Sequence, residues 1–401
     1  MKYSGVEWIG EIPDKWNVRK VKQCFYISKE QAHEENPTIL SLARAGVKIR
    51  DISNNEGQLA ASYDNYNLVM PGDLLLNPMD LYSGANCSLS EVSGVISPAY
   101  INLRKKVKLN PKFYDYYFKT QYWAMAMFAH GKGVSFDNRW TMNAETLLNY
   151  YLPFPSSDVQ DKIVDLINKK TAEIDSLIEI ENQQIDKLKE YKQAVVVETI
   201  TKGLDKNAPM KDSGVEWIGI INKESSLVRL RFLVDVETGN QDTQNAVEDG
   251  KYPFYVRSPK IERNNEYSFD GPGILMAGDG AGAGRVFHYA EGKYAVHQRV
   301  YRFSNFRLIK PRLLKYYLET MFPKVMEYGS AQTTVPSVRL PMILDFQVVI
   351  PYSQDRVLEF LDKKIIEIDS LITLKQEKIV QLEDYKKSLI YEYVTGKKEV
   401  C

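Results

Sequence analysis

The sequence is poor in the residues that form disulfides and metal sites. Its 401 residues include four histidines and three cysteines, Cys24, Cys87 and Cys401. The cysteines are odd in number and far apart, and the histidines do not recur at metal-ligand spacing. This pattern argues against a disulfide framework and against a thiolate zinc site, and it is typical of a protein in a reducing cytoplasm.

Long hydrophobic runs are also missing. No apolar segment approaches the roughly 20 residues that a membrane-spanning helix needs, and the opening MKYSGVEWIGEIP lacks the apolar centre of a signal peptide. We therefore expect a cytoplasmic protein without membrane contact. The apolar fraction of 44% and the charged fraction of 26% are those of a globular chain with room for two or three domains.

An excess of one charge is absent as well, because 52 basic residues balance 52 acidic ones. The balance does not hold locally. Residues 285–315 contain eight basic residues and one acid, and residues 104–112 contain five basic residues and no acid. Both runs lie in longer stretches of the chain that are rich in tyrosine and phenylalanine. A charge run is more often only a solvated surface, but two basic surfaces in a neutral chain also suit nucleic acid.

What the chain does contain is repetition. The string SGVEWIG stands at 4–10 and again at 213–219. Residues 160–201 match residues 354–395 without a gap, at an offset of 194 and with 16 identities. The sequence therefore predicts two copies of one plan. Their expected bounds are 1–155 for a first variable block, 156–203 for a first long helix, 204–351 for a second variable block and 352–401 for a second long helix.

The matched repeats predict two long helices, since neither contains Gly or Pro and both are rich in Leu, Ile, Lys, Glu and Gln. A helix of this length spans about 63 Å, too long to lie under one small domain. We therefore favour an antiparallel coiled coil over two helices buried separately. The heptad register predicts these interface residues: Ile167, Ile174, Leu177, Glu181 and Leu188 in the first helix, and Leu361, Ile368, Leu371, Lys375 and Leu382 in the second.

The central position of this register is charged in both helices, with Glu181 in one and Lys375 in the other. A charge in a helix interface is costly unless it is paired, and polar interface residues often set the register. An antiparallel arrangement brings the two midpoints together. We therefore expect Glu181 within one heptad layer of Lys375 or Lys378.

The variable blocks predict a mixed α/β fold. Runs at 72–77, 94–107, 272–278 and 284–289 have the β-branched and aromatic composition of strands, and the echoed segments KFYDYYFKT (112–120) and RLLKYYLET (312–320) predict helices that begin after a proline.

Motifs that suggest catalysis are weak. GDGAGAGR (278–285) is followed by a predicted strand and not by a helix, so a tight turn is the better interpretation than a nucleotide-binding loop. NPMD (77–80) lacks the second proline and the aromatic residue of the amino-methyltransferase tetrad. Asp73, Asp80 and Asp279 stand singly in turns, where carboxylates usually stabilise the turn. We therefore expect a non-catalytic chain without metal or cofactor sites of its own.

Basic residues interleaved with aromatic and small polar ones form patches at 43–50, 137–141, 255–263 and 297–303. Such patches suit phosphate anchoring and base-edge contacts, and two fall in each block. The candidate DNA-binding residues are Arg44, Lys48, Arg50, Lys132, Arg139, Arg257, Ser258, Arg285, Gln298, Arg299 and Arg339.

These motifs together resemble a known family. SGVEWIGEIP at the opening, PGDLLLN within the block, LPFPSSDVQDKI at its end and EIDSLI in the following helix resemble specificity subunits of type I restriction–modification systems. The resemblance implies two target recognition domains, separated by two antiparallel helices, that each read half of a bipartite double-stranded DNA sequence. It also implies two modification subunits docked on the helices, and restriction subunits that complete the nuclease. S-adenosylmethionine, ATP and magnesium would belong to those partners.

The second copy departs from the pattern, since it opens with SGVEWIGIINKESS and ends with PYSQD. These differences bear on the contacts with modification subunits and leave the expected fold unchanged. Two other classes remain open on the residues alone. One is a stand-alone bipartite DNA-binding protein, and the other is a coiled-coil scaffold that never touches DNA.

Overall fold

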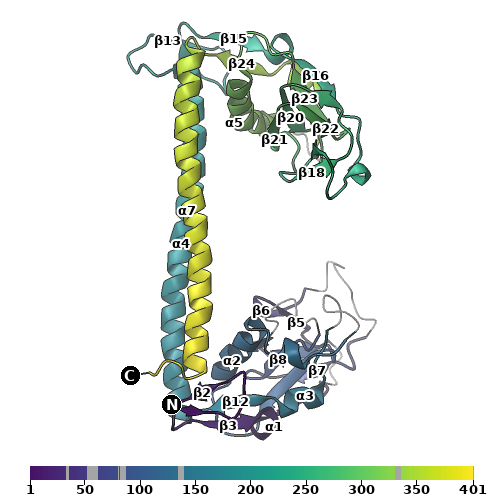
Figure 1. The fold of residues 1–401 in the computed structure, drawn as a ribbon, viewed down its shortest axis with the longest axis vertical. Helices are drawn as coiled ribbons and strands as arrows, with labels where there is room; N and C mark the ends of the chain where they lie inside the picture. The colour runs from purple at the N-terminus through teal and green to yellow at the C-terminus, as the bar shows by residue number, and fades with distance from the viewer. Residues whose placement is uncertain are drawn as a thin grey trace. The chain divides into compact units, whose positions relative to one another are not determined.

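The structure, a computed structural model, describes residues 1–32, 36–51, 62–79, 81, 87–133, 140–329 and 336–400. By its internal contacts the chain divides into two compact units (Figure 1). The first unit comprises residues 1–181 and 376–401, and the second comprises residues 182–375. Each unit therefore contains one variable block and part of each long helix.

The first unit is built on an antiparallel four-stranded sheet in the order β4-β11-β8-β9. Its strands are β4 (Phe25–Ile27), β11 (Ile101–Lys105), β8 (Leu74–Leu76) and β9 (Cys87–Leu89). A second layer pairs β5 (Leu40–Ala43) with β6 (Gly46–Ile49) and β7 (Asn67–Val69) with β10 (Gly94–Ile96). A parallel bridge between Ile39 and Val95 joins these two pairs.

The remaining elements of the first block are short strand pairs and helices. The pairs are β1 (Lys2–Tyr3) with β2 (Glu11–Ile12) and β3 (Asn17–Lys20) with β12 (Tyr151–Phe154). The helices are α1 (Val21–Cys24), α2 (Pro111–Trp123), the 3₁₀ turn η1 (Phe128–His130) and α3 (Ala144–Asn149).

The second unit has the corresponding sheet in the order β16-β23-β20-β21, and a second sheet in the order β18-β17-β22-β19. The first sheet consists of β16 (Asp235–Thr238), β23 (Val300–Ser304), β20 (Gly273–Ala277) and β21 (Phe287–Ala290). The second consists of β18 (Ile261–Asn264), β17 (Tyr252–Tyr255), β22 (Lys293–Val296) and β19 (Phe269–Asp270).

Short pairs and helices complete the second block. The pairs are β13 (Met210–Asp212) with β14 (Ile220–Asn222) and β15 (Ser226–Arg229) with β24 (Gln347–Ile350). The helices are η2 (Leu230–Phe232), η3 (Thr243–Asn245), α5 (Pro311–Gly329) and α6 (Leu340–Leu344). The strands expected within 72–77, 94–107, 272–278 and 284–289 and the helices expected after the prolines are confirmed.

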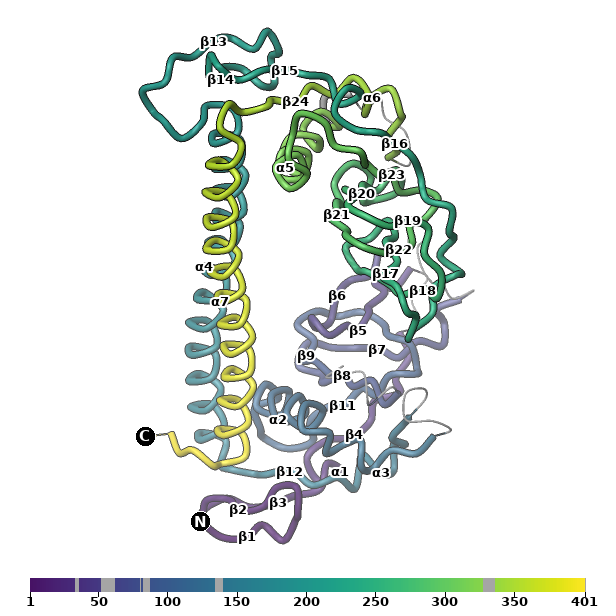
Figure 2. Tube along the Cα trace, turned by 45° about the horizontal axis from the view of Figure 1, so that its top comes forward, coloured from purple at the N-terminus to yellow at the C-terminus, as the bar shows by residue number. Residues whose placement is uncertain are grey.

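The two blocks share one topology although their sequences differ. The order β4-β11-β8-β9 corresponds to β16-β23-β20-β21, and the elements β6, β5, β10 and β7 correspond to β18, β17, β22 and β19 (Figure 2). The agreement includes direction, since β17 pairs with β22 in parallel and the Ile39–Val95 bridge is also parallel. Positions can therefore be compared between the blocks by their place in the fold.

The repeated SGVEWIG string is a structural turn in both copies. Gly5, Gly10, Gly214 and Gly219 all have φ between 65° and 78°, a conformation that favours glycine. The tryptophan of each copy stacks on an aromatic ring near the end of the block: Trp8 on Tyr150 and Trp217 on Phe346, each at 5.1 Å between ring centroids. The string therefore joins the beginning of each block to its end.

The long helices are α4 (Ser157–Lys202) and α7 (Gln354–Val394), as the repeat predicts. One glutamine fixes the start of each helix to its block. Gln160 Oε1 accepts from Asn110 N at 2.8 Å, directly before α2, and the equivalent Gln354 Oε1 accepts from Lys310 N at 2.9 Å, directly before α5.

Helix ends complete the core of each unit. The first unit buries Ile163 and Ile167 of α4 with Leu389 and Tyr393 of α7 against the aromatic residues of α2. The second unit buries Val196 and Ile200 of α4 with Leu361 and Ile365 of α7 in its own core.

Cross-helix ion pairs show that α4 and α7 are antiparallel. In the first unit Lys386 Nζ lies 2.6 Å from Asp175 Oδ1, and in the second unit Lys192 Nζ lies 2.7 Å from Asp369 Oδ1. In each unit the residue number rises along one helix as its partner's number falls. The two pairs are also equivalent under the offset of 194. Each unit therefore repeats the same contact between the two helices, and Figures 1 and 2 show α4 and α7 side by side.

The expected charged layer is confirmed. Glu181 is 6% exposed, and its Oε1 lies 2.5 Å from Lys378 Nζ. The symmetry-equivalent contact joins Lys375 to Gln184. The contact between Glu181 and Lys378 therefore joins opposite charges, whereas the contact between Lys375 and Gln184 joins a cation to a neutral amide.

The helices bury or partly bury the first position of the expected register, whereas two leucines of the second position are exposed. Ile167, Ile174, Glu181, Leu361 and Ile368 are buried, and Leu188, Lys375 and Leu382 are partly buried. Leu177 and Leu371 are instead 46% and 48% exposed. The second interface position lies one residue later, four residues after the first, and includes Ile185, Ile365, Tyr393, Ile178, Ile372 and Ile379. These alternating positions, three and four residues apart, are called the seam below.

Candidate nucleic-acid interface

Arg44 and Arg257 lie in the same turn of the shared topology. In the first block, Arg44 and Ala45 form the turn between β5 and β6, where Ala43 pairs with Gly46. In the second block, Arg257 lies in the longer turn between β17 and β18, whose strands pair at Tyr255 and Ile261. Both arginines are exposed. Exposed arginines at the tips of hairpins can enter a groove of a duplex.

Arg257 and Arg299 are brought together by Asp279. Asp279 Oδ1 accepts from Arg257 Nη1 at 2.9 Å, and its Oδ2 lies 3.5 Å from Arg299 Nη1. The three residues come from separate turns: β17–β18, β20–β21 and β22–β23. The side chains of Arg257 and Arg299 remain 45% and 65% exposed, whereas that of Asp279 is 21% exposed. Both guanidinium groups therefore contact the same carboxylate and remain exposed to solvent.

The backbone around Asp279 is held on both sides. Gly278 N donates to Arg299 O at 2.9 Å, Val338 N donates to Gly278 O at 2.7 Å, and Gly280 N donates to Pro336 O at 3.0 Å. Gly282 allows a further close approach, because a Cβ there would lie 2.6 Å from the carbonyl oxygen of Arg257. The glycines of GDGAGAGR therefore serve a tight, closely packed turn, in agreement with the sequence interpretation.

Other candidates of the second block border the same turns. Gln298 Nε2 donates to Asp242 Oδ2 at 2.6 Å, and Ser258 O accepts from His288 Nε2 at 3.0 Å. Arg285 is exposed where the 278–285 turn ends. Arg339 is exposed directly after Val338, as the residue that precedes α6. The structure thus gathers the candidates of this block around the β20–β21 turn.

The first block offers a smaller described set. Lys48 is exposed on β6, and Arg50 follows that strand with its N–H donated to Ile39 O at 2.8 Å. Lys132 is exposed and pairs with Thr141 through an isolated bridge. Arg139 lies outside the described residues.

NPMD and GDGAGAGR occupy equivalent turns. Pro78 O accepts from Met142 N at 2.9 Å, as Gly278 O accepts from Val338 N, and Met142 and Val338 each stand two residues before the corresponding helix, α3 or α6. Both motifs therefore connect the same pair of strands. Asp80 lies outside the described residues. Asp73 is buried and paired with Arg104, at 2.9 Å for each of two contacts, so it has a structural role.

Sequence reasoning missed two members of the second-block cluster. Asp279 was expected only to stabilise a turn, and His297 was not considered. His297 is 3% exposed, and its Nδ1 accepts from Arg299 N at 2.9 Å. Burial lowers the pKa of His297, and the guanidinium of Arg257 adds to that effect. No sequence signal joins these positions, because the parallel pairing of β17 with β22 brings them together.

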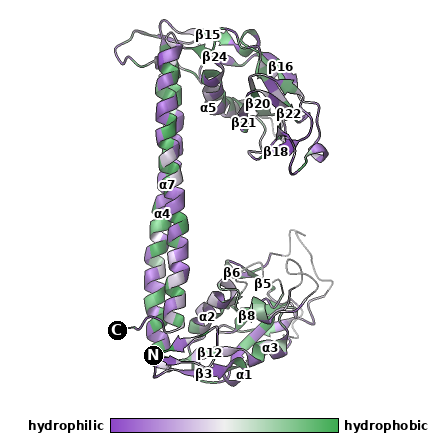
Figure 3. Cartoon of the chain, in the orientation of Figure 1, coloured by the Kyte–Doolittle hydropathy of each residue, from purple (hydrophilic) through white to green (hydrophobic). Residues whose placement is uncertain are grey.

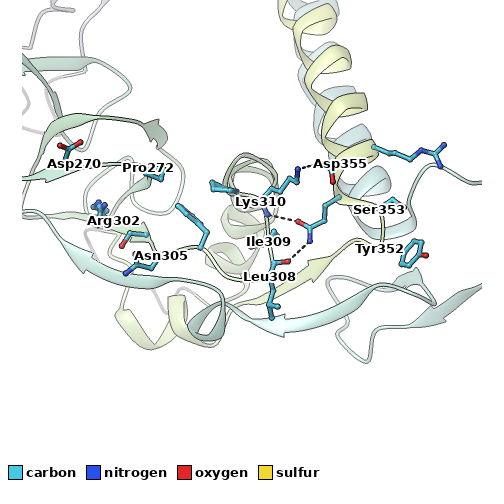
Figure 4. Close-up of a pocket in the computed structure, with 15 residues that line it drawn as sticks. Asp270, Pro272, Arg302, Asn305, Leu308, Ile309, Lys310, Tyr352, Ser353 and Asp355 are labelled. Atoms are coloured by element: carbon cyan, nitrogen blue, oxygen red, sulfur yellow. Dashed lines mark hydrogen bonds and ion pairs between the residues drawn. The ribbon is translucent and has the colours of Figure 1, made fainter.

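A cavity of about 980 Å³ in the second unit lies elsewhere, beside the first turn of α7 (Figure 4). Its lining groups are largely engaged with one another or with neighbours. Lys310 pairs with Asp355, Gln354 Nε2 donates to Leu308 O at 2.8 Å, and Arg302 Nη1 lies 2.5 Å from Glu237 Oε1. We therefore assign this cavity to the anchoring of α7 on its block.

In the described ranges, no three His, Cys, Asp or Glu side chains come together in a way that could hold a metal ion. Nor does any described helix combine the length and the apolar character needed to cross a bilayer.

Comparison with known proteins agrees with the repeated plan. The family described as "Type I restriction modification DNA specificity domain" matches residues 222–384. The type I restriction enzyme EcoDI specificity subunit of Escherichia coli is 30% identical over 145 residues, which cover 36% of this chain and 32% of that protein. The MjaVIII specificity subunit of Methanocaldococcus jannaschii is 22% identical over 365 residues, which cover 82% of this chain and 80% of that protein.

Over residues 222–384 this chain therefore matches the type I restriction–modification DNA specificity domain, and over most of its length it is similar to a type I specificity subunit. In such systems the specificity subunit is the non-catalytic part of the enzyme, and cofactors reside on partner subunits.

Solved structures share the fold. A chain from a structure described as showing complex assembly and conformational transition of the type I R-M system aligns with a TM-score of 0.69 and 13% identity, over 97% of this chain and all of that one. The HsdS subunit from Thermoanaerobacter tengcongensis aligns with a TM-score of 0.51 and 13% identity, over 99% of this chain and all of that one. At this identity the likeness concerns the fold alone.

Proposed function

We propose that this chain is a type I specificity subunit and that its two blocks each read one half of an asymmetric, bipartite double-stranded DNA target. The observation that carries the proposal is the arginine in the same exposed hairpin turn of both blocks, Arg44 and Arg257. Arginine is suited to bidentate contact with guanine, and neighbouring basic residues suit phosphate contact.

The surroundings of the two turns support an asymmetric target. In the second block, Gln298 and Arg299 stand between β22 and β23. The equivalent connection of the first block, between β10 and β11, is Ser97-Pro98-Ala99-Tyr100 and carries no basic residue. Because the two connections present different donors and acceptors, the two blocks suit different base sequences.

The outer surface of the helix pair supports docking of two like partners. Three exposed apolar residues of α4, Leu177, Ile180 and Tyr191, have equivalents in α7 at the offset of 194: Leu371, Leu374 and Tyr385. All six are between 46% and 60% exposed. Figure 3 shows hydrophobic residues along both helices. A repeated apolar surface suits two copies of one partner, and we assign it to modification subunits that bind S-adenosylmethionine.

Under this proposal the helix pair also sets the DNA spacer between the half-sites. Restriction subunits, with ATP and magnesium, would join the same complex. A stand-alone DNA-binding protein or a scaffold that ignores DNA would have no use for both the paired arginine turns and the repeated apolar surface.

The test is a chimera assembled with its modification subunits. Residues 1–155 are replaced by the first block of another specificity subunit, and the methylated sequences in a host genome are read. We expect one half-site to change and the other to stay the same. A matched exchange of residues 204–351 should change only the other half-site. If either exchange altered both half-sites, the proposal that the blocks read DNA independently would be refuted. If the parent chain with its modification subunits left the DNA unmethylated, the proposed complex would be refuted.

A further inference from the structure

We propose that Asp279 is a positioning residue that orients Arg257 and Arg299 toward base edges of the half-site that the second block reads. The inference rests on the proposed DNA-binding function. Its starting point is that an acidic residue stands at the centre of a basic surface, where it repels phosphate.

The geometry gives Asp279 a fixed position. Its carboxylate projects from a turn held by backbone bonds to two other segments, to one through Arg299 O and to the other through Pro336 O and Val338 N. Its side chain is 21% exposed, less than half the exposure of either arginine that it holds. The carboxylate of Asp279 therefore stays in place when the arginines bind a ligand. Its position sets the orientation of both guanidinium groups.

The contacts leave the recognition edge of each guanidinium open. Each arginine meets the carboxylate through Nη1, at 2.9 Å for Arg257 and 3.5 Å for Arg299. Within the described ranges, the side-chain hydrogen bond and the ion pairs of these two arginines run through Nη1 and not through the Nε and Nη2 edge. Two adjacent N–H groups are what a bidentate contact with guanine O6 and N7 requires. Holding Nη1 also reduces the rotamer freedom that a long arginine loses on binding.

The charge of Asp279 has a second consequence. Two unrestrained arginines attract any phosphate, which raises affinity for every sequence equally. With Nη1 of both arginines committed to the carboxylate, phosphate contact by these groups is disfavoured while base-edge contact remains. Asp279 thus increases discrimination between sequences at the expense of general affinity.

The experiment compares Asp279→Asn with the parent chain in the complex with modification subunits. Affinity is measured for the target duplex and for an unrelated duplex, over a range of salt concentrations. We expect the variant to bind the unrelated duplex more tightly, with a salt slope steeper by about one to two. The ratio of target to unrelated affinity should fall about 5- to 100-fold.

Asp279→Glu keeps the charge and should restore most of that ratio. Asp249→Asn is the matched control, because it removes an exposed acid of the same block that has no described contact with either arginine. It should leave both the ratio and the salt slope as in the parent. Thermal unfolding of each variant shows whether the fold is intact.

The outcomes separate the inference from the function on which it rests. A parent complex without any preference for its target would refute the proposed function. A parent with preference, together with an Asp279→Asn variant that keeps the ratio and the slope, would overturn only the role of Asp279. Equal weakening toward both duplexes would also overturn it, since that result indicates a structural contribution alone.

Discussion

Arg44 and Arg257 share a turn but differ in their neighbours. In the described part of the first block no acidic side chain contacts Arg44, whereas Asp279 contacts Arg257. Both can present a fork of donors to a base, but only Arg257 is braced by a carboxylate.

Alanine at either turn should weaken binding to the target by about 1–3 kcal/mol and relax one base pair in the corresponding half-site. The measurement is a titration against duplexes that each carry one altered base pair. Arg307→Ala is the control, since Arg307 pairs with Asp235 beyond the far end of β23. A uniform loss over all duplexes would reassign the arginine to a phosphate contact.

The protonation of His297 should make the stability of the turn that carries Arg299 depend on pH. Its Nδ1 accepts the Arg299 N–H, so the ring must be unprotonated at that nitrogen, and burial lowers its pKa. The unfolded chain therefore takes up a proton at a higher pH than the folded chain does. The stability that the neutral ring contributes is present above its unfolded pKa, about 6.5, and is lost as the pH falls through the folded pKa.

We therefore expect the free energy of unfolding to fall between pH 7 and pH 5. His297→Asn keeps an acceptor near Arg299 N and removes the titration, so this variant should lose less stability over the same range. Urea unfolding at several pH values measures both slopes. Because burial also lowers the pKa of His130 and His288, part of the slope should remain. An unchanged slope in the variant would show that His297 does not contribute.

The helix pair shows how far a sequence pattern determines an interface. The alternation of the seam places Ile185, 5% exposed, in contact with α7, while Leu177 stays 46% exposed. Ile185→Ala should cost about 2–4 kcal/mol in the free energy of unfolding, because it removes buried methyl groups. Leu177→Ala should cost less than about 1 kcal/mol.

A double variant of the exposed leucines separates the stability of the chain from its assembly with modification subunits. Leu177→Ala combined with Leu371→Ala should weaken the binding of modification subunits and leave the unfolding transition almost unchanged. Size-exclusion chromatography of the mixed subunits measures the first quantity, and urea unfolding measures the second. Strong destabilisation by the double variant would place these leucines in the seam after all.

The sequence could predict the existence and length of the helices, since these follow from the ungapped repeat and the absence of Gly and Pro. It could not decide whether the second heptad position stands three or four residues after the first. Both stripes are apolar: Leu177 and Leu371 mark one, and Ile178 and Ile372 mark the other. The interface was ambiguous because an apolar surface suited to a second partner has the same composition as the seam.

The DNA-binding candidates show the corresponding limit in the blocks. Basic–aromatic composition was enough to select Arg44 and Arg257, which the fold places in equivalent turns. The Asp279 contacts depend on strand pairings between segments distant in the sequence, and no local pattern encodes them.

For the chain as a whole, the spacer is the quantity that the helix pair should control. A seven-residue insertion after Glu181, matched by one after Lys375, adds two turns to each helix and preserves the seam. The added length is about 10 Å, or about 3 base pairs of DNA. We expect the preferred spacer to lengthen, with reduced affinity because the DNA also rotates, and the half-sites to remain the same.

Methylome sequencing of a host with the altered complex measures spacer and half-sites together. A seven-residue insertion in α4 alone is the control, since it misaligns the ion pairs at Asp175 and Lys192 and should abolish methylation. An unchanged spacer with both insertions present would separate spacer length from the helix pair.

The charged layer at the centre of the pair has a consequence for which helices can pair with each other. Two α7 helices paired in the same register would place Lys375 of each opposite Lys378 of the other, four cations without an anion among them. Two α4 helices would place Glu181 opposite Gln184 and leave both carboxylates without a lysine partner. Neither half therefore matches its own copy as well as it matches the other half. The charged layer therefore favours pairing between the two halves of one chain over pairing between two copies of the same half.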